Sequence, residues 1–303
     1  MQRVLYLLAY PFLWLLAHLP FPLLYLLSDF VFFLVYRVFG YRKGVVRSNL
    51  ELVFPEKPRE ERLQIEKRFY GHMCDMFLEM IKTMGLSEKE LSRRFTFINT
   101  ELLHRFEREG KSVMLMFPHY ASWEWVIALD HHIAAKGYGI YQPLNNRYFD
   151  KLVRDIREKF GTTLITTRET REIVARNRRK GQLASYGILS DQSPMLKKAF
   201  HWGPFMGIEV PMHTGAEQLC KSLDLPAVFL KVSKLRRGYY QGEFILLSDN
   251  PTSVPDYGIT DAFFRETERS IREAPQYYFW THKRWKHRNK KPATLATPPP
   301  RVH

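Results

Sequence analysis

Five consecutive apolar residues, Val113–Phe117, are followed at once by Pro118 and His119. A short, uninterrupted apolar run is typical of a strand that is buried on both faces, and proline ends such a strand. Residues 121–129 are again mostly apolar and favour a helix. We therefore expect His119 to lie on a strand-to-helix turn, which is where α/β sheets place reactive side chains.

Predicted strands and helices alternate through the rest of the chain. We expect strands at residues 113–117, 138–142, 163–166, 183–189, 227–232 and 239–247, and helices at residues 123–135, 148–160, 169–178 and 212–223. Apolar side chains at helical spacing in residues 59–83 predict one or two further amphipathic helices. This alternation predicts an α/β fold with a mixed, partly parallel sheet flanked by helices.

His119 is followed five positions later by Glu124, so the pair could act as a base and the carboxylate that orients it. The spacing alone is weak, because 11 His and 31 Asp plus Glu among 303 residues predict about one chance match. A second match, His104 with Glu109, lies in a charged stretch typical of a solvated helix end, and we interpret it as the chance match. Five residues along a helix turn through about 500°, so Glu124 would have to reach back to a histidine that precedes the helix. The alternative is a hydrogen-bonded histidine beside an exposed glutamate.

The first 40 residues are strongly apolar. Residues 4–28 carry no Asp, Glu, Lys or Arg, and the apolar character resumes after Asp29 and continues to Tyr36. Pro20 and Pro22 divide this stretch into segments of roughly 16 and 14 residues, each shorter than the about 20 residues that cross a bilayer as a straight helix. The pattern predicts either a hairpin in one leaflet or a single kinked span.

We therefore expect residues 1–40 to form an N-terminal, membrane-anchoring helical segment. A cleaved signal peptide is the alternative, but the charged start is only Arg3 and no clean small-x-small site follows. A basic cluster of the kind found on the cytoplasmic side of membranes comes next, formed by Arg37, Arg42, Lys43 and Arg47. The body, residues 41–291, is therefore expected to face the cytoplasm.

The formal net charge of +15 requires an acidic partner, either nucleic acid or an anionic membrane surface. Beside an apolar N-terminus we favour the membrane surface and expect no nucleic acid. Aromatic and basic residues interleave in residues 280–291 and fit the same surface, although such a segment can also bind nucleic acid. Residues 292–303 include three consecutive prolines and are expected to form a disordered tail.

Two further groups of polar residues follow predicted strands. Asn146 lies in the loop 143–147, and the next helix carries Arg157. A guanidinium suits phosphate or carboxylate, so this is a candidate anion site, with a basic surface helix as the alternative. Asp191 and Gln192 follow the strand at 183–189 and could supply a second functional carboxylate, an arginine partner, or a turn.

A third group is apolar and contains glycine. Trp202, Phe205 and Gly207 lie in a loop that could line a groove for an alkyl chain, or could simply turn the chain. Cys74 and Cys220 form neither a metal-binding pattern nor a disulfide framework, which agrees with a reducing compartment. We expect neither a metal nor a cofactor.

In their order along the chain, these residues resemble the late (secondary) acyltransferases of lipid A biosynthesis, of the lauroyl or myristoyl transferase type, within the wider glycerolipid-acyltransferase-like superfamily marked by His-x4-Asp/Glu. The resemblance covers nearly the whole chain. Its landmarks are Arg47-Ser48-Asn49-Leu50 with Phe54-Pro55, His119 with Glu124, Pro143 to Asn146 with Arg157 and Gly161, Asp191-Gln192, Phe205 to Gly207 before Pro211, Thr214-Gly215, and Gln276-Tyr277 with Trp280 to Arg284.

The resemblance implies transfer of a fatty acyl chain from acyl carrier protein, or from acyl-CoA, to a hydroxyl of a lipid A precursor at the cytoplasmic face of the inner membrane. It implies that His119 is the general base and Glu124 its partner, that Arg157 binds phosphate, and that Asp191 gives structural or electrostatic support. The sequence departs from the family where Tyr-Ala-Ser-Trp separates His119 from Glu124 and where Ser-Pro-Met follows Asp191-Gln192.

Two other functions remain open. An acyl-CoA-dependent acyltransferase acting on a lysophospholipid or glycolipid would use the same residues. A membrane-tethered nucleic-acid-binding protein would use the same positive charge and the aromatic, basic segment, but it would leave the His119 turn unexplained.

Overall fold

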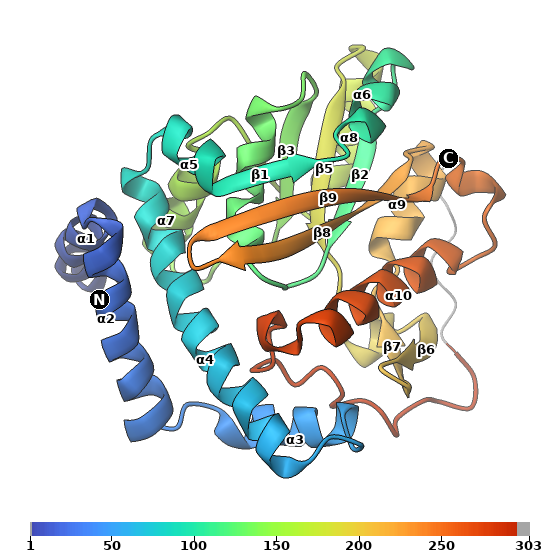
Figure 1. The fold of residues 1–303 in the computed structure, drawn as a ribbon. Coiled ribbons are helices and arrows are strands. Elements are labelled where there is room, and N and C mark those ends of the chain that lie inside the picture. The colour runs from blue at the N-terminus through green and yellow to red at the C-terminus, as the bar shows by residue number, and fades with distance from the viewer. Residues whose placement is uncertain (1, 296–303) are drawn as a thin grey trace.

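The structure is a computed structural model that describes residues 2–295, and the chain begins with helices (Figure 1). These are α1 (Gln2–His18), α2 (Phe21–Phe32), the π-helical turn η1 (Phe33–Val38), α3 (Lys43–Val53), α4 (Arg59–Lys82) and the 3-10 turn η2 (Thr83–Gly85). Among the described residues, Phe21–Val38 is the one helical stretch long and apolar enough to cross a membrane, with 18 residues and a mean hydropathy of 1.7. Most of the predicted tail, residues 296–303, lies outside the described residues.

The body is built on a seven-stranded sheet with the strand order β1-β9-β8-β2-β5-β3-β4. Its strands are β1 (Phe95–Ile98), β2 (Val113–Phe117), β3 (Lys136–Tyr141), β4 (Thr163–Thr166), β5 (Ala184–Leu189), β8 (Ala227–Arg236) and β9 (Tyr239–Ser248). Strands β8 and β9 pair antiparallel, and the other neighbours pair parallel. The predicted mixed, partly parallel sheet is confirmed.

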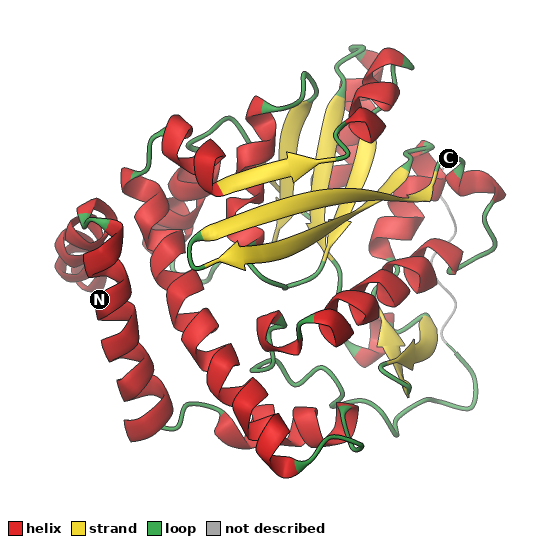
Figure 2. Cartoon of the chain, viewed as in Figure 1, coloured by secondary structure: helices red, strands yellow, loops and turns green. Residues whose placement is uncertain are grey.

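Helices cover both faces of this sheet (Figure 2). On one face α9 (Gly215–Leu223) and α10 (Gly258–Glu273) contact β2. On the other lies the 3-10 helix η3 (Trp123–His131), with α5 (Glu88–Arg94) and α7 (Arg147–Glu158) beside it. The remaining elements are α6 (Glu101–Arg108), α8 (Thr170–Arg179), the short turns η4 (Leu196–Lys198), η5 (Pro251–Ser253) and η6 (Pro275–Tyr277), and a separate antiparallel hairpin of β6 (His201–Phe205) and β7 (Ile208–Met212).

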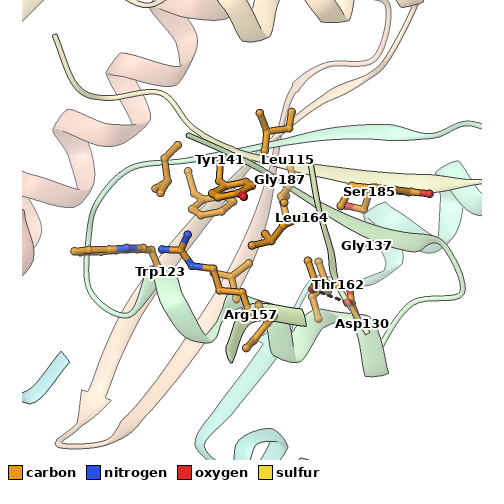
Figure 3. A pocket seen from close by; sticks show the side chains of 18 of the residues that line it. Leu115, Trp123, Asp130, Gly137, Tyr141, Arg157, Thr162, Leu164, Ser185 and Gly187 are labelled. Atoms are coloured by element: carbon orange, nitrogen blue, oxygen red, sulfur yellow. Dashed lines mark hydrogen bonds between the residues drawn. The ribbon is translucent and has the colours of Figure 1, made fainter. Parts of the chain in front are cut away.

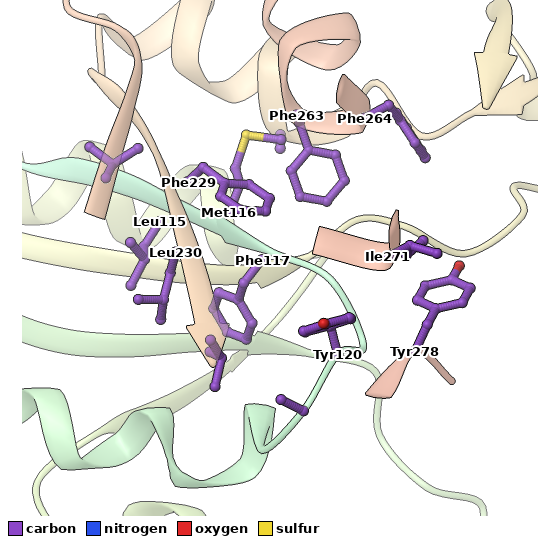
Figure 4. Close-up of a cluster of buried hydrophobic side chains, with 14 of the residues drawn as sticks. Leu115, Met116, Phe117, Tyr120, Phe229, Leu230, Phe263, Phe264, Ile271 and Tyr278 are labelled. Atoms are coloured by element: carbon purple, nitrogen blue, oxygen red, sulfur yellow. The ribbon is translucent and has the colours of Figure 1, made fainter. Parts of the chain in front are cut away.

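Strand β2 illustrates how the sequence builds both layers, because successive strand residues point to opposite faces. Met116 lies beside Phe229 of β8 and Phe263 of α10, whereas Leu115 and Phe117 point to the other face of the sheet (Figure 4). All five residues of β2 are buried, and full burial of such a side chain is worth about 1.5–3 kcal/mol. A shift of one residue would exchange the two layers, so packing on both faces holds β2 in register.

The parallel strands bring distant residues to one edge of the sheet. In the β2–β5 pair, Phe117 lies opposite Leu189, the last residue of β5. His119 and Asp191 each follow two residues later. The strand register therefore places these two side chains next to each other, although they are 72 residues apart in the sequence.

Candidate active site

His119 lies on the turn after β2, with its ring against Asp191. The ring Nδ1 is 2.7 Å from Asp191 Oδ1, and the backbone N–H of His119 donates to the same oxygen at 3.0 Å. Burial alone would raise the pKa of Asp191, but the charge of the His119 imidazole and the hydrogen bonds from its ring and backbone together lower this pKa. An ionised Asp191 holds the proton on Nδ1 and leaves Nε2 of a neutral imidazole as the proton acceptor.

The Nε2 atom of the His119 ring contacts Gln192, and the ring is partly exposed. The side chain is 19% exposed, and Nε2 lies 3.3 Å from the side-chain amide of Gln192, which donates to it. Two other histidines interact with Asp191: burial lowers the pKa of His213 and of His282 to about 4. Both rings are therefore neutral near pH 7, whereas the ring of His119 differs from them in being paired directly with Asp191.

Residues from the C-terminal part of the chain hold the His119 turn. The N–H of Phe279 donates to the His119 carbonyl at 3.1 Å, and the N–H of Ala121 donates to the Tyr277 carbonyl at 3.0 Å. The rings of Phe279 and Trp123 flank the imidazole, with centroids 6.2 and 5.2 Å away. Ala121 has a φ of 50°, a strained conformation for a residue with a Cβ that persists only when its surroundings impose it.

The C-terminal segment that holds the His119 turn is itself held by α3. Asn49 of α3 donates both side-chain N–H groups, to the carbonyls of Trp280 at 2.8 Å and of His282 at 2.9 Å.

Arg284 lies in the same part of the chain and is fully buried. Burial lowers its pKa to about 10, and the charge of Asp191 partly offsets this effect. Arg284 therefore stays positively charged near pH 7 and favours the ionised form of Asp191.

Glu124 does not contact His119, which differs from the sequence-based expectation. Its carboxylate accepts hydrogen bonds from Arg157 Nε at 2.8 Å and Nη2 at 2.6 Å, and from Trp123 Nε1 at 3.1 Å. The physical reason is that η3 carries Glu124 towards α7, while the β2–β5 register brings Asp191 to the imidazole. Arg157, expected to bind phosphate, is here paired with Glu124.

A cavity begins at the Glu124–Arg157 pair and runs under η3 along the sheet (Figure 3). It comprises about 690 Å³ of space, part of which is open to solvent. Its walls are mainly apolar, from Leu115, Phe117, Val126, Ile127, Leu129, Ile140, Leu164 and Leu189. Trp123 and Arg157 lie at one end of the cavity, and Asp130, Gly137 and Thr162 at the other.

The end of the cavity at Asp130 and Thr162 is polar and closely packed. Thr162 Oγ1 donates to Asp130 Oδ2 at 2.6 Å, and burial raises the pKa of Asp130. A Cβ on Gly137 would lie 1.9 Å from Asp130 Oδ1, and one on Gly139 would lie 2.7 Å from Leu164 Cδ2. Glycine at these two positions therefore lets the side chains of Asp130 and Leu164 pack directly against β3 in the cavity wall.

The other predicted site residues lie elsewhere. Asn146 caps α7, where its Oδ1 accepts from the N–H groups of Tyr148 and Phe149 at 3.0 and 3.4 Å. Trp202, Phe205 and Gly207 belong to the β6–β7 hairpin and do not line the cavity.

The predicted alkyl groove in that hairpin is therefore not where the cavity lies. Phe205 is fully buried and stacks on Trp285 with centroids 5.4 Å apart, and Gly207 has a φ of 78° in the hairpin turn. Phe205 and Trp285 are apolar because they pack in the core. The missed signal was the pair Gly137 and Gly139, since glycine within a strand marks a place where a ligand or another chain segment approaches closely.

The structure thus places a histidine paired with a buried carboxylate at the edge of an α/β sheet, beside an apolar cavity. The family model described as bacterial lipid A biosynthesis acyltransferase matches residues 1–287. The chain belongs to this family, and it is an O-acyltransferase that acts in acyl transfer to lipid A.

Characterised relatives cover most of the chain at low identity. The lipid A biosynthesis palmitoleoyltransferase of Escherichia coli (strain K12) is 25% identical over 285 residues, which are 91% of this chain and 89% of that protein. The lauroyltransferase of the same strain is 23% identical over 280 residues, with the same coverage. The lipid A biosynthesis acyltransferase of Haemophilus influenzae is 24% identical over 240 residues, 77% of this chain and 72% of that protein.

Proposed function

We propose that this enzyme transfers a fatty acyl group from a thioester on acyl carrier protein to a hydroxyl of a lipid A precursor, at the cytoplasmic face of the inner membrane, with His119 as the general base. One observation carries the proposal: the His119–Asp191 pair lies at the sheet edge where Phe117, Trp123 and Leu189 line the apolar cavity. Membership of the lipid A acyltransferase family supports the class of reaction and acceptor.

The chemistry follows from the geometry of the pair. As the hydroxyl oxygen attacks the thioester carbonyl carbon, its proton passes to His119 Nε2, because a neutral imidazole accepts a proton near pH 7. Asp191 stabilises the imidazolium without taking the proton. The carbon–sulfur bond then breaks, the imidazolium returns the proton to the leaving sulfur, and an ester and a free thiol result. The hydroxyl takes the place of the Gln192 amide at Nε2.

We place the acyl chain in the cavity under η3. The cavity follows β3 from Gly137 to Tyr141, and four strand steps of about 3.3 Å make about 13 Å. An extended alkyl chain with C–C bonds of about 1.5 Å advances about 1.25 Å per carbon, so about ten carbons fit before the polar end at Asp130. A chain of medium length is therefore the favoured donor.

The Glu124–Arg157 pair would frame the mouth of this cavity, where the thioester must lie. Both side chains are mostly buried, with 8% and 25% exposure, and removing one partner of such a pair leaves the other charge unpaired. We propose that the pair positions the thioester, and that Arg157 faces the phosphate of the donor or acceptor.

An acidic carrier protein suits the charge of the enzyme. The net charge of +15 steers acidic partners to the surface and is screened by salt. The experiment that tests the proposed function uses purified enzyme in detergent micelles with acyl carrier protein donors, acyl-CoA donors, a lipid A precursor and a lysophospholipid. Mass spectrometry of lipid A from cells with and without the gene accompanies it.

We expect one acyl chain to be added to the lipid A precursor, with consumption of the acyl carrier protein donor that depends on acceptor. Faster transfer from acyl-CoA to the lysophospholipid would support the alternative acyltransferase instead. Intact donors together with a shift of labelled oligonucleotide would support a binding protein and contradict acyl transfer.

The position of the acyl chain is tested by Gly139→Ala. The added Cβ would press on Leu164 Cδ2 and move that side chain into the cavity, so we expect preference among C8 to C16 donors to shift by at least about two carbons towards shorter chains, at about 1.25 Å per carbon. Gly44→Ala is the matched control, because a Cβ there meets nothing within 4 Å. An unchanged chain preference in an active Gly139→Ala enzyme would show that the acyl chain lies elsewhere.

A further inference from the structure

The exposed apolar side chains of α1, α2, η1 and the turn that follows η1 form a broad apolar surface, which we call the N-terminal apolar face. The two helices lie at one side of the molecule, with α2 running along α4 (Figure 1). The face consists of side chains that are between 37% and 75% exposed: Val4, Leu5, Leu7, Leu8, Tyr10, Phe12, Trp14, Leu15, Leu23, Leu26, Phe30, Phe33, Val38, Phe39 and Tyr41. A soluble monomer rarely exposes a contiguous apolar patch beyond a few hundred Å², so this face requires a partner.

The opposite side of α2 is attached to the body by polar contacts. The Tyr25 hydroxyl donates to Glu79 Oε1 at 2.8 Å, and the Ser28 hydroxyl donates to Asp75 Oδ1 at 2.7 Å. Both carboxylates belong to α4 and are buried. Buried carboxylates are costly without hydrogen-bond donors, so α2 contributes groups that the body needs.

A third contact joins α2 to the turn between β8 and β9. Arg237 on this turn donates to Asp29 Oδ1 at 2.6 Å and to Asp75 Oδ1 at 2.7 Å. A Cβ on the next residue, Gly238, would lie 2.0 Å from the Tyr25 hydroxyl. The helix therefore lies directly against this turn, with Arg237 bridging a carboxylate of α2 and one of α4.

Helix α1 is attached near both of its ends. Tyr6 stacks on Tyr148 of α7, with ring centroids 5.7 Å apart. At the other end Lys82 Nζ donates to the Ala17 carbonyl at 2.8 Å, and a Cβ on Gly85 would lie 2.2 Å from the same oxygen. Both α1 and α2 therefore pack against the body, in addition to being joined to it by the chain.

We infer that α1 and α2 remain docked on the body and lie in the plane of one membrane leaflet, with the N-terminal apolar face among the lipid chains, and that the stretch Phe21–Val38 does not cross the bilayer. Tyr25, Ser28 and Asp29 lie within that stretch, and all three bind the body. If the stretch crossed the membrane, these contacts would have to break or their body partners would have to enter the hydrocarbon, where unpaired polar groups are expensive.

Charge and side-chain type favour a lipid leaflet over a second protein as the partner. Cations lie close in sequence to the apolar face: Arg3 precedes it, and Arg37, Arg42 and Lys43 lie at its C-terminal end. A helix with an apolar face, aromatic residues and flanking cations is typical of interfacial membrane binding, and cations attract anionic headgroups. Because α1 also contacts α7, which carries Arg157, docking would hold the mouth of the cavity close to the membrane surface.

The experiment uses single-cysteine labelling of the full chain in membrane vesicles. The native Cys74 and Cys220 are buried, so wild type is the unlabelled control for a membrane-impermeant maleimide. We expect Gln2→Cys and Lys89→Cys, on α1 and on the body, to react in inverted vesicles and to stay protected in right-side-out vesicles. Reaction of Gln2→Cys from the side opposite to Lys89→Cys would establish a single span and overturn the inference.

Depth measurement excludes a hairpin that crosses and returns. Fluorophores at Leu8→Cys and Leu26→Cys, in phosphatidylethanolamine–phosphatidylglycerol vesicles, are expected to be quenched by nitroxides near the headgroup and at least about twofold less by nitroxides near the chain end, since interfacial helices lie about 5–10 Å deep. Lys89→Cys should not be quenched. Stronger quenching of Leu26→Cys by the deep nitroxide would contradict in-plane docking. Neither the labelling nor the quenching depends on catalysis, so failure of this inference and failure of the proposed function can be distinguished.

Discussion

Replacement of His119 by alanine is expected to lower turnover at least about 100-fold, because general base catalysis typically contributes 10²–10⁴. The measurement is kcat of the purified enzyme with saturating donor and acceptor, together with the thermal unfolding midpoint. The ring is the side-chain partner of the buried Asp191 carboxylate, so we also expect a lower unfolding midpoint, because a buried carboxylate that loses its partner is destabilising.

His104→Ala is the matched control for His119→Ala. His104 lies on α6, where Nδ1 is 3.0 Å from Glu107 Oε2, a contact within the helix. We expect wild-type turnover from this variant. Loss of activity in His104→Ala with normal turnover in His119→Ala would reverse the assignment of the base.

Replacement of Asp191 by asparagine is expected to lower kcat about 10³-fold or more, as the equivalent change does in serine protease triads. The amide would keep the size of the side chain, but its NH₂ group favours the wrong imidazole tautomer and it cannot stabilise the imidazolium. Arg284 would also lose the charge that offsets its burial. The thermal unfolding midpoint must therefore be measured together with kcat.

Glu124→Gln separates the two carboxylates. This change weakens the ion pair with Arg157 but leaves the Asp191–His119 contact in place, so we expect a loss at least about tenfold smaller than in Asp191→Asn, a difference of about 1.4 kcal/mol in activation free energy. If Glu124→Gln were the more damaging change, the Glu124–Arg157 pair and not the Asp191–His119 pair would make the larger contribution to the rate.

The sequence was sufficient to predict β2, because an unbroken apolar run followed by proline has few other solutions. The predicted strand 113–117 matches Val113–Phe117 of the structure. The predicted helix at 123–135 begins correctly but is a 3-10 helix that ends at His131. Propensity indicates that a helical turn starts there; it does not distinguish a 3-10 from an α-helix.

The partner of His119 could not be read from local spacing. Glu124 was the nearest acid in the sequence, but the contact belongs to Asp191, 72 residues away. Only the pairing of β2 with β5 makes them neighbours. Asp191 was identified as a candidate because it follows a strand, and its particular role required the strand order.

Apolar composition was also ambiguous between core and cavity. Trp202 and Phe205 suggested an alkyl groove, yet both are buried in the structure. The cavity instead runs along β3, where Gly137 and Gly139 leave room for the Asp130 and Leu164 side chains that line it. Hydrophobic periodicity is read from the side chains that are present. The packing around glycines in a strand is therefore harder to predict from sequence than the position of large apolar residues.

The way in which residues 277–282 hold the His119 turn bears on how the enzyme is made. The chain emerges from the ribosome in order, so β2, β5 and the His119–Asp191 pair leave it before the backbone of Phe279 that clamps the turn. The clamp in turn depends on Asn49, one of the earlier residues to emerge. A partly synthesised chain already has its apolar N-terminal helices and its imidazole but lacks the clamp. Competence to transfer acyl groups is thus gained only near the end of synthesis, so a nascent or truncated chain at the membrane would not consume activated fatty acid.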